Sequence, residues 1–341
     1  MRRTDKKTQR EYTIAEENIL EVNDLRVDIK VDDYVLNAVR GVSFTMKKGE
    51  TLGLVGESGC GKSVTSKEVM GINPDNCSST GEVLFRTKAG KVLNLLTLDK
   101  DGAVYRGLRG TEMAMIFQEP MTAFSPLYTI GNQLSEIILI HEPKTTKAQA
   151  RERVLEMLKK VGIANPEKRI DQYPHEFSGG MLQRALIAMM LLCSPDFLVA
   201  DEPTTALDAT IQGQILSLIT EQSRKRGMAV LFITHDLGVV ARIADNVGVM
   251  YSGHLVEHAP TAELFRNSLH PYTRGLMRSA PGRAAMGMKR LPAITGSVPR
   301  LDNMPEGCPF APRCDEALPR CFESVPVARC EGDHSVACWA V

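Results

Sequence analysis

A glycine-rich segment between an apolar run and a helical pattern contains the residue types that bind phosphate. Its eight residues, in the pattern G-x-x-x-x-G-K-S, are Gly56, Glu57, Ser58, Gly59, Cys60, Gly61, Lys62 and Ser63. Glycines let backbone N–H groups converge on phosphate oxygens, and the helix that follows adds a partial positive charge. We expect Lys62 to contact the β- and γ-phosphates of ATP and the Ser63 hydroxyl to bind Mg²⁺. The segment therefore predicts a P-loop.

Two acidic residues, Asp201 and Glu202, follow directly on the apolar run 197–200. An acid at the carboxyl end of a parallel strand faces the crevice in which α/β proteins bind ligands. We expect Asp201 to hold Mg²⁺ through water and Glu202 to polarise a water molecule for attack on the γ-phosphate. An apolar strand followed by two acids is a common pattern, and without the P-loop it would indicate only a strand-end cap. Together the two segments predict one nucleotide-hydrolysing site.

Gln118 and His235 stand at the ends of two further apolar runs, 113–117 and 228–233. Polar residues at such strand ends can reach the same crevice. A single histidine after a strand is more often structural or solvated than catalytic, so position alone leaves the role of His235 open.

Short apolar runs alternate with helical patterns along most of the chain. The runs typical of strands buried on both faces are 51–55, 113–117, 197–200 and 228–233. Residues 25–29 and 42–46 alternate in polarity as half-buried strands do, residues 80–98 are interpreted as a small antiparallel insertion, and residues 128–195 are mostly helical. This order predicts an α/β fold with a parallel-sheet core, an antiparallel β insertion and a helical subdomain.

The apolar periodicity fades from about residue 267, where prolines begin to recur. We place a boundary near residue 265. The expected organisation is a polar tail at 1–18, a main domain at 19–265 and a small loop-rich extension at 266–341.

Composition excludes several classes of protein. The 341 residues contain 41 Lys+Arg and 41 Asp+Glu, so a broad nucleic-acid-binding surface is not expected. Hydrophobic residues at 43% and charged residues at 24% describe an ordinary globular protein. The longest apolar run, 185–193, is too short to cross a bilayer, and the polar start lacks the apolar core of a signal peptide.

The segment Phe177-Ser178-Gly179-Gly180-Met181-Leu182-Gln183-Arg184 resembles the signature motif of ABC-type ATPases. The other motifs fall in that family's order: P-loop at 56–63, Q-loop residue Gln118, signature at 177–181, Walker B at 197–202, D-loop at Ala206-Leu207-Asp208, and switch histidine His235. The resemblance covers residues 19–265. It implies that Gln118 senses Mg²⁺ and the γ-phosphate, and that His235 holds the γ-phosphate.

The signature motif also has a physical interpretation, because Ser178, Gly179 and Gly180 open a predicted helix and present its N–H groups to an anion. In ABC ATPases this site closes over ATP bound by the partner subunit in a head-to-tail dimer. Two departures from the family pattern stand out. Met181 replaces the usual glutamine, and either Ile29 or Tyr34 could take the place of the aromatic residue that stacks on adenine.

A closer resemblance is to ATP-binding subunits of bacterial dipeptide and oligopeptide importers. The motifs that carry it lie at 56–63, 115–121, 201–208 and in His270-Pro271-Tyr272-Thr273. It implies an ATPase that powers peptide import from the cytoplasmic face of the bacterial inner membrane. The implied partners are a sister ATPase, in a heterodimer rather than a homodimer, two transmembrane permease subunits and, indirectly, an external binding protein. A soluble ABC ATPase of translation or DNA repair, and nickel or glycoside cargo, are the alternatives.

Five of the eight cysteines lie in the last 34 residues, which in a reducing compartment suggests metal rather than disulfides. Cys308, Cys314, Cys321 and Cys338 lack the tight pairs of structural zinc sites and the spacing of short ferredoxin motifs. Their spacing predicts one metal site of soft thiolates, with free cysteines as the alternative. The importer resemblance implies a [4Fe–4S] cluster on these four, with Cys330 as the spare residue and zinc as the alternative metal.

Overall fold

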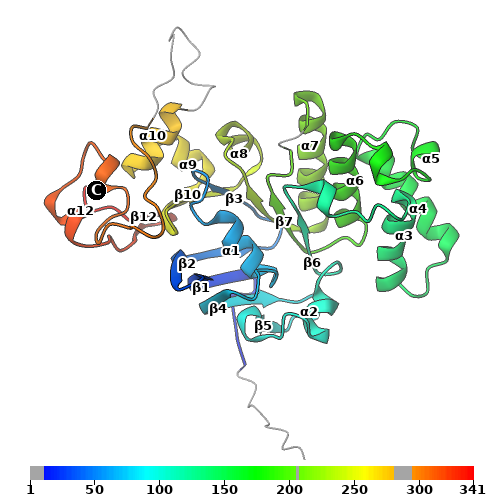
Figure 1. The fold of residues 1–341 in the computed structure, drawn as a ribbon, viewed down its shortest axis with the longest axis horizontal. Coiled ribbons are helices and arrows are strands. Elements are labelled where there is room, and N and C mark those ends of the chain that lie inside the picture. Colours follow the sequence, from blue (N-terminus) through cyan, green and yellow to red (C-terminus); the bar gives the residue numbers. More distant parts are fainter. Residues whose placement is uncertain (1–10, 205–206, 280–293) are drawn as a thin grey trace, which may run out of the picture.

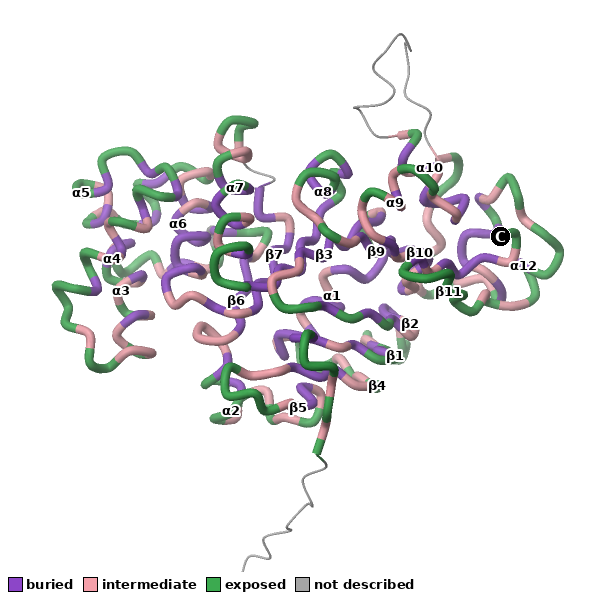
Figure 2. Tube along the Cα trace, turned by 180° about the vertical axis from the view of Figure 1, so that it is seen from behind, coloured by how far each residue is buried: buried purple, intermediate pink, exposed green. Residues whose placement is uncertain are grey.

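The computed structural model describes residues 11–204, 207–279 and 294–341. Two β-sheets, a group of helices and a C-terminal segment make up the fold (Figure 1). Buried stretches concentrate along the central strands, while the outer turns and helix surfaces are exposed (Figure 2). No helix in these described ranges combines the length and the apolar character needed to span a membrane.

The larger sheet places the predicted strand ends along one edge. Among the described residues it has eight strands in the order β11-β12-β10-β9-β3-β8-β7-β6. The five parallel strands are β3 (Thr51–Val55), β6 (Met113–Ile116), β7 (Phe197–Asp201), β8 (Ala229–Ile233) and β9 (Asn246–Tyr251). Because parallel strands end at the same edge, the segments after β3, β6, β7 and β8 all emerge together, as the apolar runs predicted.

Alternating side chains of these strands enter two different cores. Val230 and Phe232 pack with the helices, whereas Ala229, Leu231 and Ile233 pack toward the second sheet. A strand that is buried on both faces needs apolar residues at every position. The sequence of each of these strands is therefore a continuous apolar run.

The second sheet is antiparallel, in the order β2-β1-β4-β5. Its strands are β1 (Asn18–Val31), β2 (Tyr34–Lys47), β4 (Cys77–Arg86) and β5 (Val92–Asn94). The predicted insertion at 80–98 is confirmed as β4 and β5, which extend β1. Helix α1 (Lys62–Val69) contributes Val69 to the core that joins the two sheets. The short helices η1 (Leu95–Thr97) and α2 (Ala103–Leu108) follow β5.

A group of helices covers the β6 end of the larger sheet (Figure 1). It comprises η2 (Pro120–Thr122), α3 (Ile130–His141), α4 (Lys147–Lys160), α5 (Pro166–Arg169), η3 (Pro174–Glu176) and α6 (Gly179–Leu191). The side chains of Thr146 and Gln149 form a capping box at the start of α4, whose buried stripe is Ala150, Val154 and Leu158. Helices α7 (Ala209–Arg226) and α8 (Leu237–Ile243) follow β7 and β8. The predicted helical subdomain at 128–195 is confirmed.

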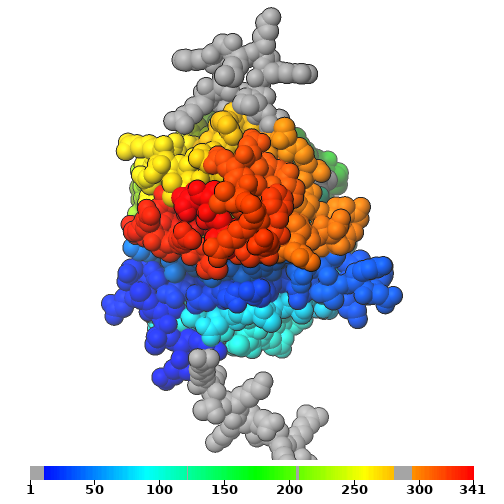
Figure 3. Space-filling model, turned by 90° about the vertical axis from the view of Figure 1, so that its left-hand side faces the viewer, coloured from blue at the N-terminus to red at the C-terminus, as the bar shows by residue number. Residues whose placement is uncertain are grey.

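The C-terminal segment packs against the main sheet rather than standing apart. Strand β10 (His254–Pro260) pairs with β12 (His334–Val336), which pairs with β11 (Arg329–Glu331). The helices here are α9 (Thr261–Arg266), α10 (Pro271–Ser279), η4 (Ala311–Arg313) and α12 (Pro319–Glu323). Figure 3 shows this segment, in orange and red, lying directly above the blue strands of the second sheet. The division of the chain at residue 265 stays a prediction.

Candidate functional site

The P-loop connects β3 to α1 by a tight path that only glycine can follow at two positions. Gly56 has φ +152°, and a Cβ there would lie 2.2 Å from the Met250 carbonyl oxygen. Gly61 has φ +102°, and its Cβ would lie 2.7 Å from the Ala38 carbonyl oxygen. The backbone is therefore pressed against neighbouring strands, leaving Ser58 and Gly59 exposed for a ligand.

Lys62 is buried at the start of α1 and points back into the loop. Its Nζ donates to the carbonyl oxygens of Gly56 at 2.8 Å and of Glu57 at 3.0 Å. Cys60 is buried beside it, and burial raises the pKa of the Cys60 thiol. The loop thus presents one cation, the amine of Lys62, beneath its exposed rim, which suits an anionic phosphate chain.

Ser63 and Asp201 bring two hard oxygen donors together below the P-loop. The Ser63 hydroxyl donates to Asp201 Oδ1 at 3.2 Å. Asp201 ends β7 and is buried, and this burial raises the pKa of its carboxyl group. A bound cation would favour the ionised carboxylate and offset that effect. A hydroxyl and a carboxylate are ligands that Mg²⁺ prefers, so these residues fit the expected ion.

Gln118 and His235, two of the predicted strand-end residues, both contact the third, Glu202. Gln118 Nε2 donates to Glu202 Oε2 at 3.2 Å, and His235 Nδ1 lies 3.1 Å from Glu202 Oε1. Because an ionised carboxylate only accepts hydrogen bonds, His235 donates from Nδ1 and leaves Nε2 for another partner. Glu202 also has φ +48°, one of six positive φ values at non-glycine residues in the described part of the chain.

The signature segment forms the start of α6, as expected. Ser178 is the N-cap, and its Oγ accepts from the Met181 N–H at 3.3 Å. Ser178 and Gly179 are exposed, so this helix end is open to a second molecule. Met181 is half-buried and packs against the helical core, which accounts for an apolar residue at this position. The partner of the exposed end stays a prediction.

The D-loop residue Asp208 has a visible structural role. Its carboxylate caps α7 by accepting from the N–H groups of Thr210 and Ile211 at 3.1 Å and 3.0 Å. Ala206 lies outside the described residues. Gln183 of α6 donates to the Pro203 carbonyl oxygen at 2.9 Å and so ties the signature helix to the segment after Glu202.

The two candidates for adenine stacking differ in exposure. Tyr34 begins β2 and is 71% exposed, whereas Ile29 is half-buried in β1, opposite Leu36. An exposed ring is free to pack on a base, and Ile29 is already partly covered. The assignment to Tyr34 stays a prediction.

The four late cysteines of the expected metal site line one small pocket in the C-terminal segment. The pKa of Cys308 is raised to about 11, chiefly by burial and to a smaller extent by the nearby Cys321 and Cys338. Backbone N–H groups point at the sulfurs, including that of Ala340, which lies 3.4 Å from Cys338 Sγ. Cys330 is exposed on β11, outside this pocket.

The expected metal-binding character of the extension is not supported as a single-ion site. In the part of the chain that the structure describes, no group of three or more His, Cys, Asp or Glu side chains is arranged to hold a metal ion. Four thiolates around one zinc must all lie about 2.3 Å from it, and this close arrangement is missing.

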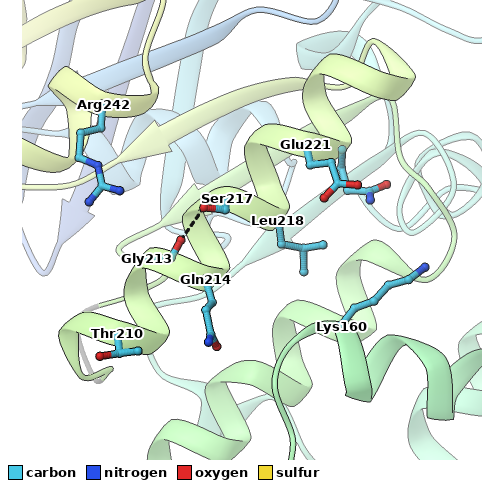
Figure 4. Close-up of a pocket in the computed structure, with 9 residues that line it drawn as sticks. Lys160, Thr210, Gly213, Gln214, Ser217, Leu218, Glu221 and Arg242 are labelled. Carbon is cyan, nitrogen blue, oxygen red and sulfur yellow. Dashed lines mark hydrogen bonds between the residues drawn. The ribbon is translucent and has the colours of Figure 1, made fainter.

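A surface hollow elsewhere contains none of the predicted nucleotide-site residues (Figure 4). It is lined mainly by α7, with Lys160 at the end of α4 and Arg242 of α8 beside it. Ser217 donates to the Gly213 carbonyl oxygen within the helix. We assign no ligand to this hollow.

Two residues that touch the P-loop were not predicted to do so. Arg313 contacts the Glu57 carboxylate, and the Tyr272 hydroxyl accepts from the Glu57 N–H. Tyr272 lies in the His270–Thr273 motif, which the sequence offered only as a family marker. The tyrosine in this motif was the available sequence signal for such a contact. The sequence does not show which residue its hydroxyl binds, because the partner is 215 residues away.

Two family models match separate parts of the chain, and relatives match most of its length. Residues 39–205 match the model described as ABC transporter, and residues 256–321 match the oligopeptide/dipeptide transporter C-terminal region. The dipeptide transport ATP-binding protein DppD of Bacillus subtilis is 48% identical over 327 residues, covering 95% of each chain. A probable peptide ABC transporter ATP-binding protein of Sinorhizobium fredii is 49% identical over 324 residues, covering 94% of each chain.

Solved structures show the same fold over about seven-tenths of this chain. The ATP-binding cassette MJ0796, a dimer bound to ADP and Pi, superposes with a TM-score of 0.64 at 23% identity, covering 71% of this chain and 99% of that one. CbiO1 from Clostridium perfringens, part of an ABC transporter complex, gives a TM-score of 0.59 at 28% identity, covering 74% and 92%.

Proposed function

The chain belongs to the ATP-binding proteins of peptide ABC transporters, which hydrolyse ATP to drive import, and we propose that the group formed by Gln118, Glu202 and His235 is its hydrolytic centre. The observation that carries this proposal is the pair of contacts on Glu202, at 3.2 Å from Gln118 and 3.1 Å from His235. Three separate strand ends supply these residues, which a structural cap would not require.

The P-loop binds the phosphate chain of ATP in this proposal. Backbone N–H groups of residues 58–63 and the α1 N-terminus face the phosphates, and the Lys62 amine neutralises their charge. Ser63 and Asp201 would hold Mg²⁺, whose charge supports the β- and γ-phosphates when it is bound.

Glu202 accepts the proton of the attacking water as that water adds to the γ-phosphorus. Gln118 and His235 hold the carboxylate in place, and His235 would also donate from Nε2 to the γ-phosphate when its imidazole carries both protons. The bond to the β-phosphate oxygen breaks, and ADP leaves with the electron pair.

The exposed N-terminus of α6 completes the site of a second ATPase subunit in this proposal. Ser178 and Gly179 are exposed, and the helix dipole favours an anion at this end. We propose a head-to-tail dimer with a sister subunit rather than with a second copy of this chain. The MJ0796 cassette is described as a dimer, which is compatible with pairing but is neutral on the identity of the partner.

The subunit works with membrane permease subunits, and we propose that it binds them from the cytoplasmic face of the bacterial inner membrane. Peptide cargo is favoured by the C-terminal region match and by the names of the relatives.

The test of this function is peptide uptake by vesicles that contain the purified transporter. We expect external di- or oligopeptide, with the binding protein present, to raise ATP hydrolysis and to accumulate inside the vesicles. A nickel salt and a glycoside serve as competing cargoes. Uptake of either in place of peptide would contradict the assignment of cargo.

We propose further that Cys308, Cys314, Cys321 and Cys338 bind a [4Fe–4S] cluster. The four line one pocket, and backbone N–H groups point at three of the sulfurs, as they do around such clusters. Each thiolate of a cubane binds a different iron, so the sulfurs lie further apart than around a single ion. The lack of a single-ion arrangement among the described residues is therefore compatible with a cluster.

Anaerobically purified protein should contain about four iron atoms and about four acid-labile sulfides per chain. Cys321→Ser should lose most of both, because Cys321 is a buried member of the pocket. Cys330→Ser is the matched control and should retain them, because Cys330 is exposed on β11. Stoichiometric zinc without iron, or full iron content in Cys321→Ser, would reject the cluster.

A further inference from the structure

Glu57, the second residue of the P-loop, is held by the C-terminal segment through two separate contacts. Its carboxylate accepts from the Arg313 guanidinium at 2.7 Å from Nη1 and 3.1 Å from Nη2. Its backbone N–H donates to the Tyr272 hydroxyl at 2.9 Å. On the other side, its carbonyl oxygen accepts from Lys62 Nζ at 3.0 Å. Side chain, N–H and carbonyl are thus each fixed.

Arg313 is built into the fold as a buried cation. Its side chain is 5% exposed, and it also donates to the Thr295 carbonyl oxygen at 2.9 Å and the Tyr251 hydroxyl at 3.1 Å. The hydrogen bonds to the Glu57 carboxylate raise the pKa of Arg313, so the guanidinium stays charged. A planar guanidinium that binds a carboxylate with both of its N–H arms fixes direction as well as distance.

Both partners of Glu57 rest on well-anchored elements. Arg313 is the last residue of η4. The chain just before this turn is anchored, because the Cys308 N–H donates to the Cys321 carbonyl oxygen at 2.7 Å. Tyr272 is fully buried in α10, with its ring 4.6 Å from that of Tyr251. Tyr251 ends β9, directly after the Met250 carbonyl against which Gly56 is pressed. The C-terminal segment and β9 therefore enclose the start of the P-loop.

We propose that Arg313 and Tyr272 are positioning residues that hold the P-loop in its phosphate-binding shape, so that the C-terminal segment sets the affinity of the chain for ATP. The inference rests on the proposed role of the P-loop. If Glu57 shifts, its carbonyl moves, and the Lys62 amine bound to that carbonyl moves with it. The contacts of Gln118 and His235 with Glu202 come from other strand ends, so hydrolysis of ATP already bound should change little.

Arg313→Gln is the first test. We expect the Kd and the KM for ATP to rise about tenfold, with kcat at saturating ATP within about twofold of wild type. Amide hydrogen exchange of residues 56–61, measured without nucleotide, should become faster. Arg300→Gln is the control, because it breaks an exposed ion pair with Asp302 in the same segment. It should leave the Kd, the KM, kcat and the exchange rates unchanged.

Two further variants separate positioning from folding. Tyr272→Phe removes only the hydroxyl and should raise the Kd by about threefold, a result that decides the question if Arg313→Gln fails to fold. Glu57→Gln combined with Arg313→Gln should be no worse than Arg313→Gln alone, because both changes break one contact.

Wild-type ATP affinity in folded Arg313→Gln and Tyr272→Phe would overturn the inference, as would strictly additive effects in the double variant. The exchange measurement needs no ATP. Faster exchange at 56–61 in a protein that does not bind ATP would therefore refute the proposed function while keeping the positioning role.

Discussion

Glu202→Gln is expected to lower the kcat of ATP hydrolysis at this chain's own P-loop by about a thousandfold while ATP binding stays close to wild type. The substitution keeps the length of the side chain and leaves an amide that can still bond to Gln118 and His235. It removes the carboxylate that is proposed to accept the proton of the attacking water. The P-loop, Lys62 and the Ser63–Asp201 pair are untouched, so the nucleotide still binds.

The measurement needs a purified complex in which the hydrolytic carboxylate of the sister ATPase has been neutralised, so that turnover reports this chain alone. Glu221→Gln is the matched control, because Glu221 is an exposed carboxylate on α7 paired with Lys225. Its kcat should equal that of wild type. A Glu202→Gln complex that keeps half or more of wild-type turnover would remove Glu202 from the proposed mechanism.

The proximity of the members of the proposed hydrolytic group could be predicted because they follow apolar runs. A run of four to six apolar residues predicts a strand buried on both faces, and parallel strands must end at one edge. That rule places Gln118, Glu202 and His235 near one another without any side-chain detail. The left-handed backbone at Glu202 could not be predicted in the same way, because a glutamate gives no local signal for positive φ.

The contact between Arg313 and Glu57 lies beyond such pattern arguments. The two residues are 256 positions apart, and the C-terminal segment has no periodicity that would fix its path over the sheet. The role of Asp208 is easier to predict from local sequence. An aspartate before a helical pattern predicts an N-cap, and the Asp208 carboxylate caps α7 in the structure. The position of Met181 follows from packing, since the half-buried side chain contacts the helical core.

Gly179→Asp is the second large effect that we expect, and it acts on ATP held by the partner. A Cβ added at Gly179 would meet no atom within 4 Å, so the chain accommodates the new side chain. Aspartate in the first turn of α6 also interacts favourably with the helix dipole, by about 0.3–1 kcal/mol. The melting temperature should therefore hold or rise slightly. The carboxylate nevertheless occupies the exposed helix end that is proposed to meet the γ-phosphate, and like charges repel strongly in a closed, water-poor site.

The clearest background for this test is a complex in which only this chain carries Glu202→Gln. Its remaining turnover comes from ATP on the sister's P-loop, which the α6 N-terminus of this chain is proposed to cover. Adding Gly179→Asp should reduce that turnover by about a hundredfold or more, while ATP binding to this chain's own P-loop is unchanged.

Gly213→Asp is the matched control for Gly179→Asp. Gly213 lies on α7, and a Cβ there also meets no atom within 4 Å, so the same charge is added at a similarly open helix position. This control should keep the turnover of its background. Native mass spectrometry of the same preparation should find one copy of this chain per complex, since the proposal pairs it with a sister subunit. Two copies would establish a homodimer, and undiminished turnover in Gly179→Asp would show that α6 does not act on a partner's ATP.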